Sequence, residues 1–194
     1  MRELEIDGHR LNIEEEWAWD NEAGAVVWDA ALVLAYYLSA RPELVRGRRV
    51  LELGTGPGAA NGLSSIATAV PLRWGDALPP AEQLPGQPLE VVLASDVLYQ
   101  AEALPLFIRT LCQVFAANPE ACLILCIEHR PALPFPAALF AAAGLRGRRL
   151  PTAEQHPEWR SDDIHLFCIQ LAAAASGGHG QQQAASGSSN DSDR

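Results

Sequence analysis

The feature that most constrains the fold is a short apolar strand that runs directly into a glycine-rich turn. Residues 51–58 read Leu-Glu-Leu-Gly-Thr-Gly-Pro-Gly, and residues 49–53 form the predicted strand. Glycine lacks a Cβ, so it permits a tight turn and lets a ligand approach the backbone closely. A plain strand-to-helix connection could use the same residues, so the turn alone does not separate a ligand site from a structural turn.

Predicted strands and helices alternate through most of the chain. Residues 89–94 and 121–127 are apolar runs of strand length, which is typical of parallel strands covered on both faces. Weak alternation over residues 4–13 indicates a hairpin, and further strands are expected at 70–74 and 164–171. Helices are expected over residues 28–38, 59–69, 104–115 and 136–143. The alternation predicts an α/β fold with three layers and a mostly parallel sheet.

Size and charge limit the classes of function. The 194 residues favour one domain, and the stretch from 172 onward is rich in alanine, serine, glycine and glutamine. We therefore expect a folded domain over residues 1–171 and a disordered tail over 172–194. The net charge of −10 argues against binding a nucleic-acid backbone. All 14 basic residues are arginine, because the chain contains no lysine.

The apolar runs and the cysteines indicate a soluble protein of a reducing compartment. No run approaches the roughly 20 residues that span a bilayer, and residues 1–12 lack the apolar stretch of a signal peptide. Cys112, Cys122, Cys126 and Cys168 form no CxxC pair and lie in or beside apolar segments, so we expect buried free thiols and no metal site. We expect a monomer in the cytoplasm, with the nucleus as a second location, and no membrane or nucleic-acid partner.

The glycine turn becomes more specific when other segments are considered with it. Its ExGxGxG form, with Glu52 before the glycines, is the S-adenosylmethionine version of such a turn and differs from the GxGxxG dinucleotide version. Further segments follow in order: Val-Trp-Asp-Ala-Ala at 27–31, Leu-Arg-Trp-Gly-Asp at 72–76, Ala-Ser-Asp-Val-Leu-Tyr at 94–99, Glu-His-Arg at 128–130 and Asp-Ile-His-Leu-Phe at 163–167. In this order they resemble the seven-β-strand, methyltransferase-like enzymes that methylate lysines on chaperones and AAA-type ATPases. The resemblance covers residues 11–171 in pieces, and Asp96-x-x-Tyr99 is its most distinctive part.

The resemblance implies a Rossmann-like, three-layer methyltransferase fold and protein-lysine N-methyltransferase activity. It implies S-adenosylmethionine as the cofactor and a protein substrate, such as a chaperone or an AAA-type ATPase. The implied cofactor-binding residues are Trp28, Glu52, Gly54, Thr55, Gly56, Trp74, Asp76 and Ser95. Asp96 and Tyr99 would be the catalytic residues, lining the channel where the target amine meets the methyl donor. Because the sulfonium methyl is already activated, such residues mainly have to position an uncharged amine.

Structural roles remain open for several of these residues. Trp28 and Trp74 could be ordinary core side chains, and Asp96 could be the N-cap of the helix that follows it. The Asp96-x-x-Tyr99 pattern argues against a methyltransferase for small molecules. The spacing of the glycines argues against a nicotinamide-dependent dehydrogenase.

The family pattern breaks after the glycine turn. A nucleotide-binding βαβ unit usually places an acidic residue about 20 residues beyond its turn to hold the ribose, yet no Asp or Glu lies between Glu52 and Asp76. In one interpretation, residues 59–69 are the crossover helix, residues 70–74 are the second strand, and Asp76 holds the ribose.

In the other interpretation, which we prefer, residues 72–76 match the end of the family's third strand, and about one βα unit is missing after Gly58. The sheet would then be incomplete. We accordingly expect weak or absent cofactor binding and methyl transfer. A non-catalytic protein-binding module derived from such an enzyme is the alternative function.

Overall fold

The computed structural model describes residues 2–13, 26–55, 67–80 and 88–172. The predictions for Gly56, for most of the helix at 59–69 and for the tail beyond residue 172 lie outside the described residues. Within the described ranges, no helix has both the length and the apolar character that crossing a membrane requires.

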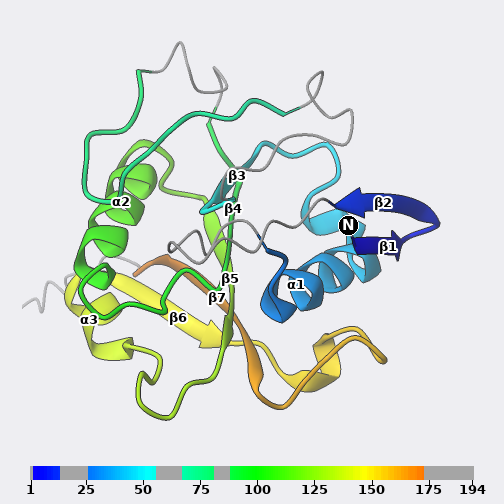
Figure 1. The fold of residues 1–194 in the computed structure, drawn as a ribbon. Helices are drawn as coiled ribbons and strands as arrows, with labels where there is room; N and C mark the ends of the chain where they lie inside the picture. Colours follow the sequence, from blue (N-terminus) through cyan, green and yellow to red (C-terminus); the bar gives the residue numbers. More distant parts are fainter. Residues whose placement is uncertain (1, 14–25, 56–66, 81–87, 173–194) are drawn as a thin grey trace, which may run out of the picture.

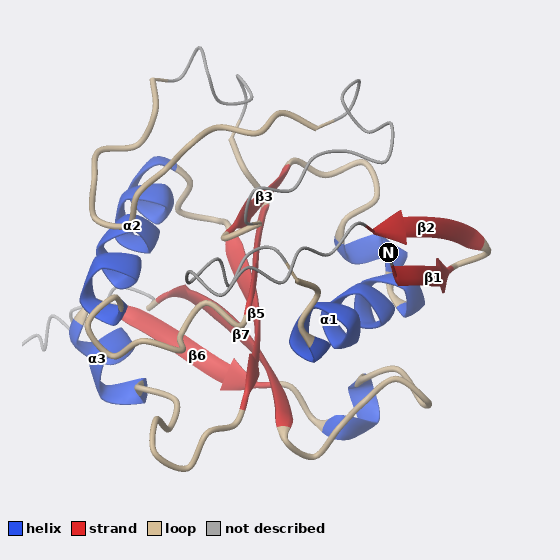
Figure 2. Cartoon of the chain, viewed as in Figure 1, coloured by secondary structure: helices blue, strands red, loops and turns tan. Residues whose placement is uncertain are grey.

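A five-stranded sheet forms the centre of the fold (Figure 2). Its strands, in spatial order, are β3 (Val50–Leu53), β4 (Val91–Ser95), β5 (Cys122–Glu128), β7 (Ile164–Leu171) and β6 (Leu145–Arg149). β4 pairs in parallel with both β3 and β5, whereas β7 runs antiparallel to its neighbours β5 and β6. Four strands therefore share one direction and β7 opposes them, which confirms the prediction of a mostly parallel sheet.

Helices cover both faces of the sheet, which confirms the expected three layers (Figure 1). α1 (Asp29–Ala40) packs on one face, where its Tyr37 joins Ile124 of β5 in a buried cluster. α2 (Leu104–Ala117) and α3 (Ala137–Ala142) cover the other face. The predicted helices at 28–38, 104–115 and 136–143 correspond to these three elements.

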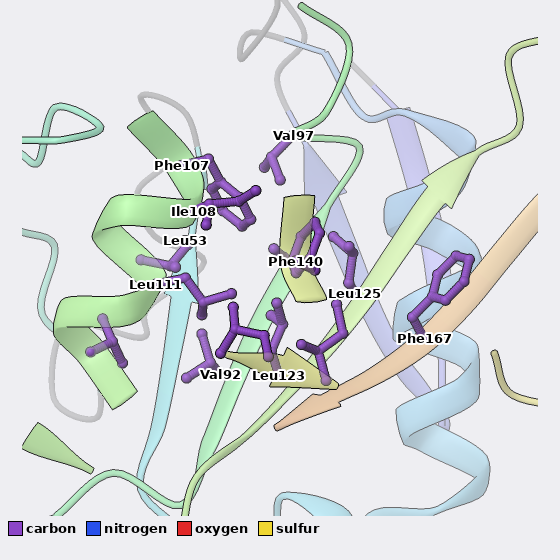
Figure 3. Packing of buried hydrophobic residues seen from close by; sticks show 14 of the residues in the cluster. Leu53, Val92, Val97, Phe107, Ile108, Leu111, Leu123, Leu125, Phe140 and Phe167 are labelled. Carbon is purple, nitrogen blue, oxygen red and sulfur yellow. The ribbon is translucent and has the colours of Figure 1, made fainter. Parts of the chain in front are cut away.

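The larger core lies between α2 and the sheet. Figure 3 shows Phe107 and Leu111 of α2 near Val92 and Leu123 of the sheet, and all four side chains are fully buried. Burying a large apolar side chain contributes about 1.5–3 kcal/mol. Because these α2 positions recur at helical spacing, one face of the helix is fixed across the strands that carry the candidate site.

Asn118 ends α2 and joins it to the segment that enters β4. Its side-chain oxygen accepts a hydrogen bond from the backbone N–H of Leu89 at 2.6 Å. Its side-chain nitrogen donates to the carbonyl of Val114 at 2.8 Å. The side chain is buried and both hydrogen bonds are internal, so Asn118 fixes the start of β4 relative to the helix.

The predicted hairpin at the N-terminus is confirmed. β1 (Arg2–Ile6) and β2 (His9–Ile13) pair antiparallel through a two-residue turn. Asp7 and Gly8 both have positive φ, 51° and 73°, as a type I′ turn requires. The hydroxyl of Tyr36 in α1 donates to a backbone carbonyl of β1 at 3.0 Å, which attaches the hairpin to the domain.

Two short 3₁₀ helices lie near the end of α1. They are η2 (Pro42–Leu44) and η4 (Thr152–Glu154). Arg41 connects them, because it directly precedes η2 and its Nε donates to the carbonyl of Glu154 at 3.0 Å.

The strand expected at residues 70–74 is not formed, and this part of the chain is irregular. Side chains of α2 bind its backbone instead. The N–H of Gly75 donates to the hydroxyl of Thr110 at 2.8 Å, and the N–H of Leu78 donates to Gln113 at 3.1 Å. Trp74 packs edge-on against Phe107, with ring centroids 5.3 Å apart. The prediction was wrong because a short apolar run indicates only that its side chains are buried. Here they are buried against the surface of α2 and not within a sheet.

β6 was not predicted, because its arginines give no apolar pattern. Its residues read Leu-Arg-Gly-Arg-Arg, and only the first is buried. The strand lies at the edge of the sheet and pairs with β7 alone. Charged side chains on an edge strand discourage pairing with another chain, and they also remove the apolar alternation that would reveal a strand.

β3 forms the opposite edge of the described sheet, with β4 as its only described partner. It leads into Gly54, so the glycine turn lies at a sheet edge rather than between two strands. The seven-strand resemblance implies further strands outside β3. The described sheet of five is thus two strands short of the family number.

All four cysteines are free, as expected, but they are not all buried. Cys126 is fully buried on β5, whereas Cys112, Cys122 and Cys168 are half-buried. Burial raises the pKa of the Cys112 thiol.

Candidate active site

The carboxyl ends of the parallel strands bring the sequence-predicted residues to one edge of the sheet. β3 ends before Gly54, β4 ends before Asp96, and β5 ends at Glu128. In open α/β sheets, ligands bind outside these ends. A binding site is therefore expected at this edge of the sheet.

Gly54 packs directly against the loop that follows β4. Its φ is +85°, and a Cβ built on it would lie 2.6 Å from Cγ1 of Val97 and 3.6 Å from Cζ2 of Trp74. Real Cβ atoms do not approach other heavy atoms at 2.6 Å, so a side chain cannot be added here without movement. The structure thus brings the glycine turn, Trp74 and the residue after Asp96 into contact.

Asp96 is held in a strained and buried position at the end of β4. It is 8% exposed and has a φ of +49°, which is unusual for a residue other than glycine. Its N–H donates to the carbonyl of Cys126 at 2.8 Å, which extends the pairing of β4 with β5. Strained backbone of this kind is concentrated at functional sites.

The alternative role of Asp96 as a helix N-cap is wrong. The next helix, α2, begins at Leu104, its N-cap is Ala103, and no side chain caps it. The intervening residues form a separate loop that includes Val97 and Tyr99. Asp96 therefore has no helix end to bind, and its side chain pairs instead with Arg130, which lies two residues beyond the end of β5.

Both carboxylate oxygens of Asp96 are bound by Arg130. The two guanidinium nitrogens donate to Oδ1 and Oδ2 at 2.8 and 2.7 Å, in the bidentate geometry that fits a carboxylate. Arg130 also donates to Oε2 of Glu128 at 2.8 Å. The hydrogen bonds to Asp96 are the main reason that the pKa of Arg130 is raised.

Arg130 was not among the predicted site residues, although its segment was noted as part of the resemblance. The signal was the acidic-x-Arg pattern directly after an apolar strand. That pattern gave no indication of which carboxylate the arginine would bind. Asp96 and Arg130 are far apart in the sequence, and only the parallel pairing of β4 with β5 brings them together.

The remaining predicted residues differ in their exposure. Trp28 precedes α1 and is 43% exposed, and Tyr99 is 48% exposed, so neither is an ordinary core residue. Trp74 and Ser95 are half-buried, whereas Thr55 and Asp76 are exposed. Trp74 packs against the core cluster and also lies beside the glycine turn, so it is both a core residue and a neighbour of the candidate site.

Glu52 lies on β3, immediately before the turn. It alternates with Leu51 and Leu53, which face the α2 core, so its side chain projects toward the face that carries α1. The carboxylate remains accessible, but neighbouring atoms partly desolvate it and raise its pKa.

A small hollow lies beside Glu128, the second carboxylate that Arg130 binds. Its walls come from the loop after β4, the start of α2, the end of β5 and the proline-rich segment that follows β5. The lining residues are Leu98, Gln100, Leu104, Ile127, Glu128, Leu133, Pro134, Phe135 and Pro136. The hollow is apolar except for Gln100 and Glu128.

The described residues fit one end of S-adenosylmethionine better than the other. Gly54 and Thr55 are both exposed at the end of β3, where the amino-acid end of the cofactor would lie beside Trp74. For the ribose, two described acids lie between β3 and β4. Glu90 accepts from the backbone of Arg49 and forms an ion pair with Arg48, which leaves Asp76 as the candidate.

Comparisons with known proteins agree on one family. The lysine methyltransferase family matches residues 5–65 and 59–134, which together cover about two thirds of the chain. The two matches meet just after the glycine turn, where the sequence spacing predicted a missing βα unit.

Individual relatives are enzymes of this family. Protein-lysine N-methyltransferase EFM3 of Chaetomium thermophilum is 30% identical over 161 residues, covering 64% of this chain and 48% of that protein. Protein N-lysine methyltransferase METTL21A of Danio rerio is 26% identical, covering 56% of this chain and 63% of that protein. EEF1A lysine methyltransferase 3 of Xenopus tropicalis is 27% identical, covering 63% and 66%. The chain thus spans about half to two thirds of the length of these relatives.

The topology of the sheet, its two helical layers and the family match agree on the fold, a Rossmann-like S-adenosylmethionine-dependent methyltransferase fold. The chain belongs to the lysine methyltransferase family.

Proposed function

We propose that this chain transfers a methyl group from S-adenosylmethionine to a lysine side chain of another protein. The observation that carries the proposal is the contact of the glycine turn with the loop that begins at Asp96. Through Val97, that contact places the cradle for a methyl donor next to the buried and strained carboxylate. Membership of the lysine methyltransferase family supports the same reaction.

Each part of the edge has a distinct task in this proposal. The cofactor supplies an activated methyl group when it is bound. Gly54 and Thr55 bind its amino-acid end, with Glu52 and Ser95 nearby, and Gly56 belongs to the same turn outside the described residues. Trp28 and Trp74 border the cofactor, Trp74 on the adenine side, and Asp76 holds the ribose.

Asp96 and Tyr99 position the incoming amine. Because Arg130 binds both oxygens of Asp96, the carboxylate has one fixed orientation and does not turn toward solvent. Tyr99 follows on the same loop and is accessible to a substrate. An amine held here in its uncharged form needs little more than alignment with the methyl donor.

We further propose a cytoplasmic or nuclear location, a monomeric state and a chaperone or an AAA-type ATPase as the substrate. The relatives' names support a protein substrate only in general terms, since the name of one relative gives EEF1A as its target.

Cofactor affinity is the weak point of this chain. Asp76 lies on irregular chain rather than at the end of a second strand, so it supplies only part of the ribose contact, whose full worth of about 1.5–3 kcal/mol corresponds to about tenfold to a hundredfold in affinity. We therefore expect isothermal titration with S-adenosylmethionine to give binding weaker than the micromolar range. Asp76→Asn should weaken it further, whereas Glu120→Gln, at an exposed acid near the start of β5, serves as the control. Micromolar binding by the wild type would show that the predicted missing unit is unnecessary.

Methyl transfer can be tested without interference from the enzyme itself. The chain has no lysine, so methyl-lysine found after incubation with labelled S-adenosylmethionine must come from an added protein. We expect label on lysines of a recombinant chaperone or AAA-type ATPase, and less label with Asp96→Ala. If the protein binds the cofactor but labels no lysine in either substrate, the proposed function is wrong.

A further inference from the structure

Two cysteines lie beside each other on the face of the sheet that α1 covers. Cys168 of β7 packs against the buried cluster under α1, and Ile124, its partner on β5, belongs to that cluster. Cys122 lies two residues before Ile124, and side chains two residues apart on a strand share a face. Cys122 and Cys168 are therefore diagonal neighbours across the pairing of β5 with β7.

The hydrogen-bond pattern of this pairing brings the two thiols close together. The N–H of His129 donates to the carbonyl of Asp163 at 2.6 Å, so the odd-numbered positions of β5 are the hydrogen-bonded ones. The even-numbered positions, which include Cys122, are non-hydrogen-bonded, and side chains approach more closely at such positions. The thiol of Cys122 donates a hydrogen bond to the sulfur of Cys168.

A cation faces Cys168 from the other neighbouring strand. Arg148 of β6 is directly opposite Cys168 in the pairing of β6 with β7, and its side chain is 62% exposed. Glu154 of η4 lies 3.5 Å from Arg148, in an exposed ion pair that contributes little. On α1, Tyr37 is buried beside this group, and the guanidinium of Arg41 lies 5.7 Å from the centre of its ring. The charged and titratable groups on this side are thus two arginines, one carboxylate, one phenol and the second thiol.

These neighbours favour the thiolate form of Cys168. The hydrogen bond from Cys122 lowers the pKa of Cys168 most, burial raises it and Arg148 lowers it, and the pKa falls to about 7. The same hydrogen bond raises the pKa of Cys122, because the donated proton is held between the two sulfurs. Burial alone raises the pKa of Cys112, which is equally half-buried. Cys168 is therefore the nucleophile of the pair, since the thiolate is the reactive form of a cysteine.

We propose that Cys168 is a site of thiol–disulfide exchange with small disulfides of the glutathione class, assisted by the thiol of Cys122 and the guanidinium of Arg148. The thiolate of Cys168 attacks one sulfur of the disulfide, and the S–S bond of that disulfide breaks. The second glutathione leaves as a thiolate and takes up a proton from solvent, so a mixed disulfide forms without a further oxidant. The site lies under α1, and its chemistry does not depend on methyl transfer.

The exchange stops at the mixed disulfide. Diagonal neighbours on antiparallel strands have Cα atoms about 7–8 Å apart, whereas a disulfide needs a separation below about 7 Å. Cys122 therefore donates a hydrogen bond to Cys168 but does not displace the bound glutathione.

The reaction can be followed site by site in the full chain. We would incubate the protein with oxidised glutathione at neutral pH and locate the adducts by mass spectrometry of its peptides. Cys168 should form the adduct at least about fivefold faster than Cys112, because the gain in thiolate fraction exceeds the loss of nucleophilicity. Cys112 is the internal control, since it is half-buried like Cys168 and burial is the only influence on its pKa.

Variants separate the effect of the neighbours from that of exposure. Cys122→Ala removes the donor, so it should slow the adduct at Cys168 about threefold to fivefold and raise the pH midpoint of iodoacetamide alkylation. Cys122→Ser keeps a donor and should retain most of the effect. Arg148→Gln should raise the midpoint by a smaller amount, and Cys112→Ser should leave it unchanged.

Several results would overturn the proposal. These are an adduct that forms on Cys112 as fast as on Cys168, no adduct on Cys168 in the folded protein, and an internal disulfide between Cys122 and Cys168. An unchanged midpoint in Cys122→Ala would also overturn it. Circular dichroism checks that each variant folds, and Arg148→Gln, on an exposed edge strand, tests the midpoint if Cys122→Ala does not fold.

Discussion

Replacing Gly54 with alanine tests whether the glycine turn is required by packing and not only by a ligand. The backbone at Gly54 is left-handed, with φ of +85°. An added Cβ would lie 2.6 Å from Cγ1 of Val97, which is 9% exposed and belongs to the main core. The methyl group therefore meets a buried side chain in addition to an unfavourable backbone conformation.

Two costs combine in this variant. A left-handed conformation costs an L-residue about 1–2 kcal/mol, and overpacking a core costs about 1–3 kcal/mol. Alanine also lowers the conformational entropy of the unfolded chain, which stabilises the folded state by about 0.4–1 kcal/mol. We expect Gly54→Ala to lower the free energy of unfolding by about 2–4 kcal/mol, a large fraction of the stability of a small domain.

Gly144→Ala is the matched control for the backbone cost. Gly144 has φ of +74° and no heavy atom within 4 Å of the position of an added Cβ. Only the conformational cost applies there, so the expected loss is about 1 kcal/mol. The difference between the two variants isolates the contact with Val97.

A double-mutant cycle with Val97→Ala identifies the contact directly. Truncating Val97 removes Cγ1, so the added methyl group at position 54 no longer meets it. The combined variant should therefore lose about 1–2 kcal/mol less than the two single losses added together. Urea unfolding followed by circular dichroism gives these free energies. A loss for Gly54→Ala no greater than that for Gly144→Ala would refute the reasoning.

Three further predictions concern the surroundings of the site. Arg130→Gln should destabilise the fold by about 2–3 kcal/mol because it leaves the buried Asp96 without its partner, whereas Arg109→Gln on exposed α2 surface should have little effect in the same urea titration. Asn118→Ala should lose about 1–3 kcal/mol, because the N–H of Leu89 is left unpaired; a loss below about 0.5 kcal/mol would show that water replaces the side chain. Burial, followed by Arg149, lowers the pKa of His165, so its contribution to stability is present above its unfolded value of about 6.5 and is lost as the pH falls through the folded value. His165→Gln should therefore reduce the drop in melting temperature below pH 6.5, and an unchanged profile would contradict this.

The elements that the sequence predicted well are those whose own residues determine their burial. α2 and β5 have apolar side chains at the correct spacing for helix and strand, and both formed as expected. β6 has an edge position and three arginines, so no local pattern distinguishes it from a connecting segment. At residues 70–74, Trp74 packs on Phe107 of α2, and a sequence pattern does not reveal whether the neighbour of an apolar side chain is a strand or a helix.

The site was predictable as a set of positions but not as a set of contacts. Asp96 was identified from its place after an apolar strand, and the strand end is where the structure has it. Its bond to Arg130 depends on the parallel register of β4 and β5, in which Ser95 lies beside Cys126. Sequence patterns report neighbours along the chain, whereas a bidentate ion pair depends on neighbours across the sheet.

The edge at β3 connects three separate observations to one cause. The family matches the chain in two pieces that meet after the glycine turn. No Asp or Glu lies between Glu52 and Asp76, and β3 has no described strand on its outer side. A βαβ unit needs about 30 residues, so the interval between Leu53 and Val91 does not hold the crossover to β4 together with two further strands and their helices. A family fold that lacks one βα unit beside β3 explains all three observations. The missing unit affects the cofactor end of the site, whereas the ends of β4 and β5, with Asp96, Arg130 and Glu128, are unaffected.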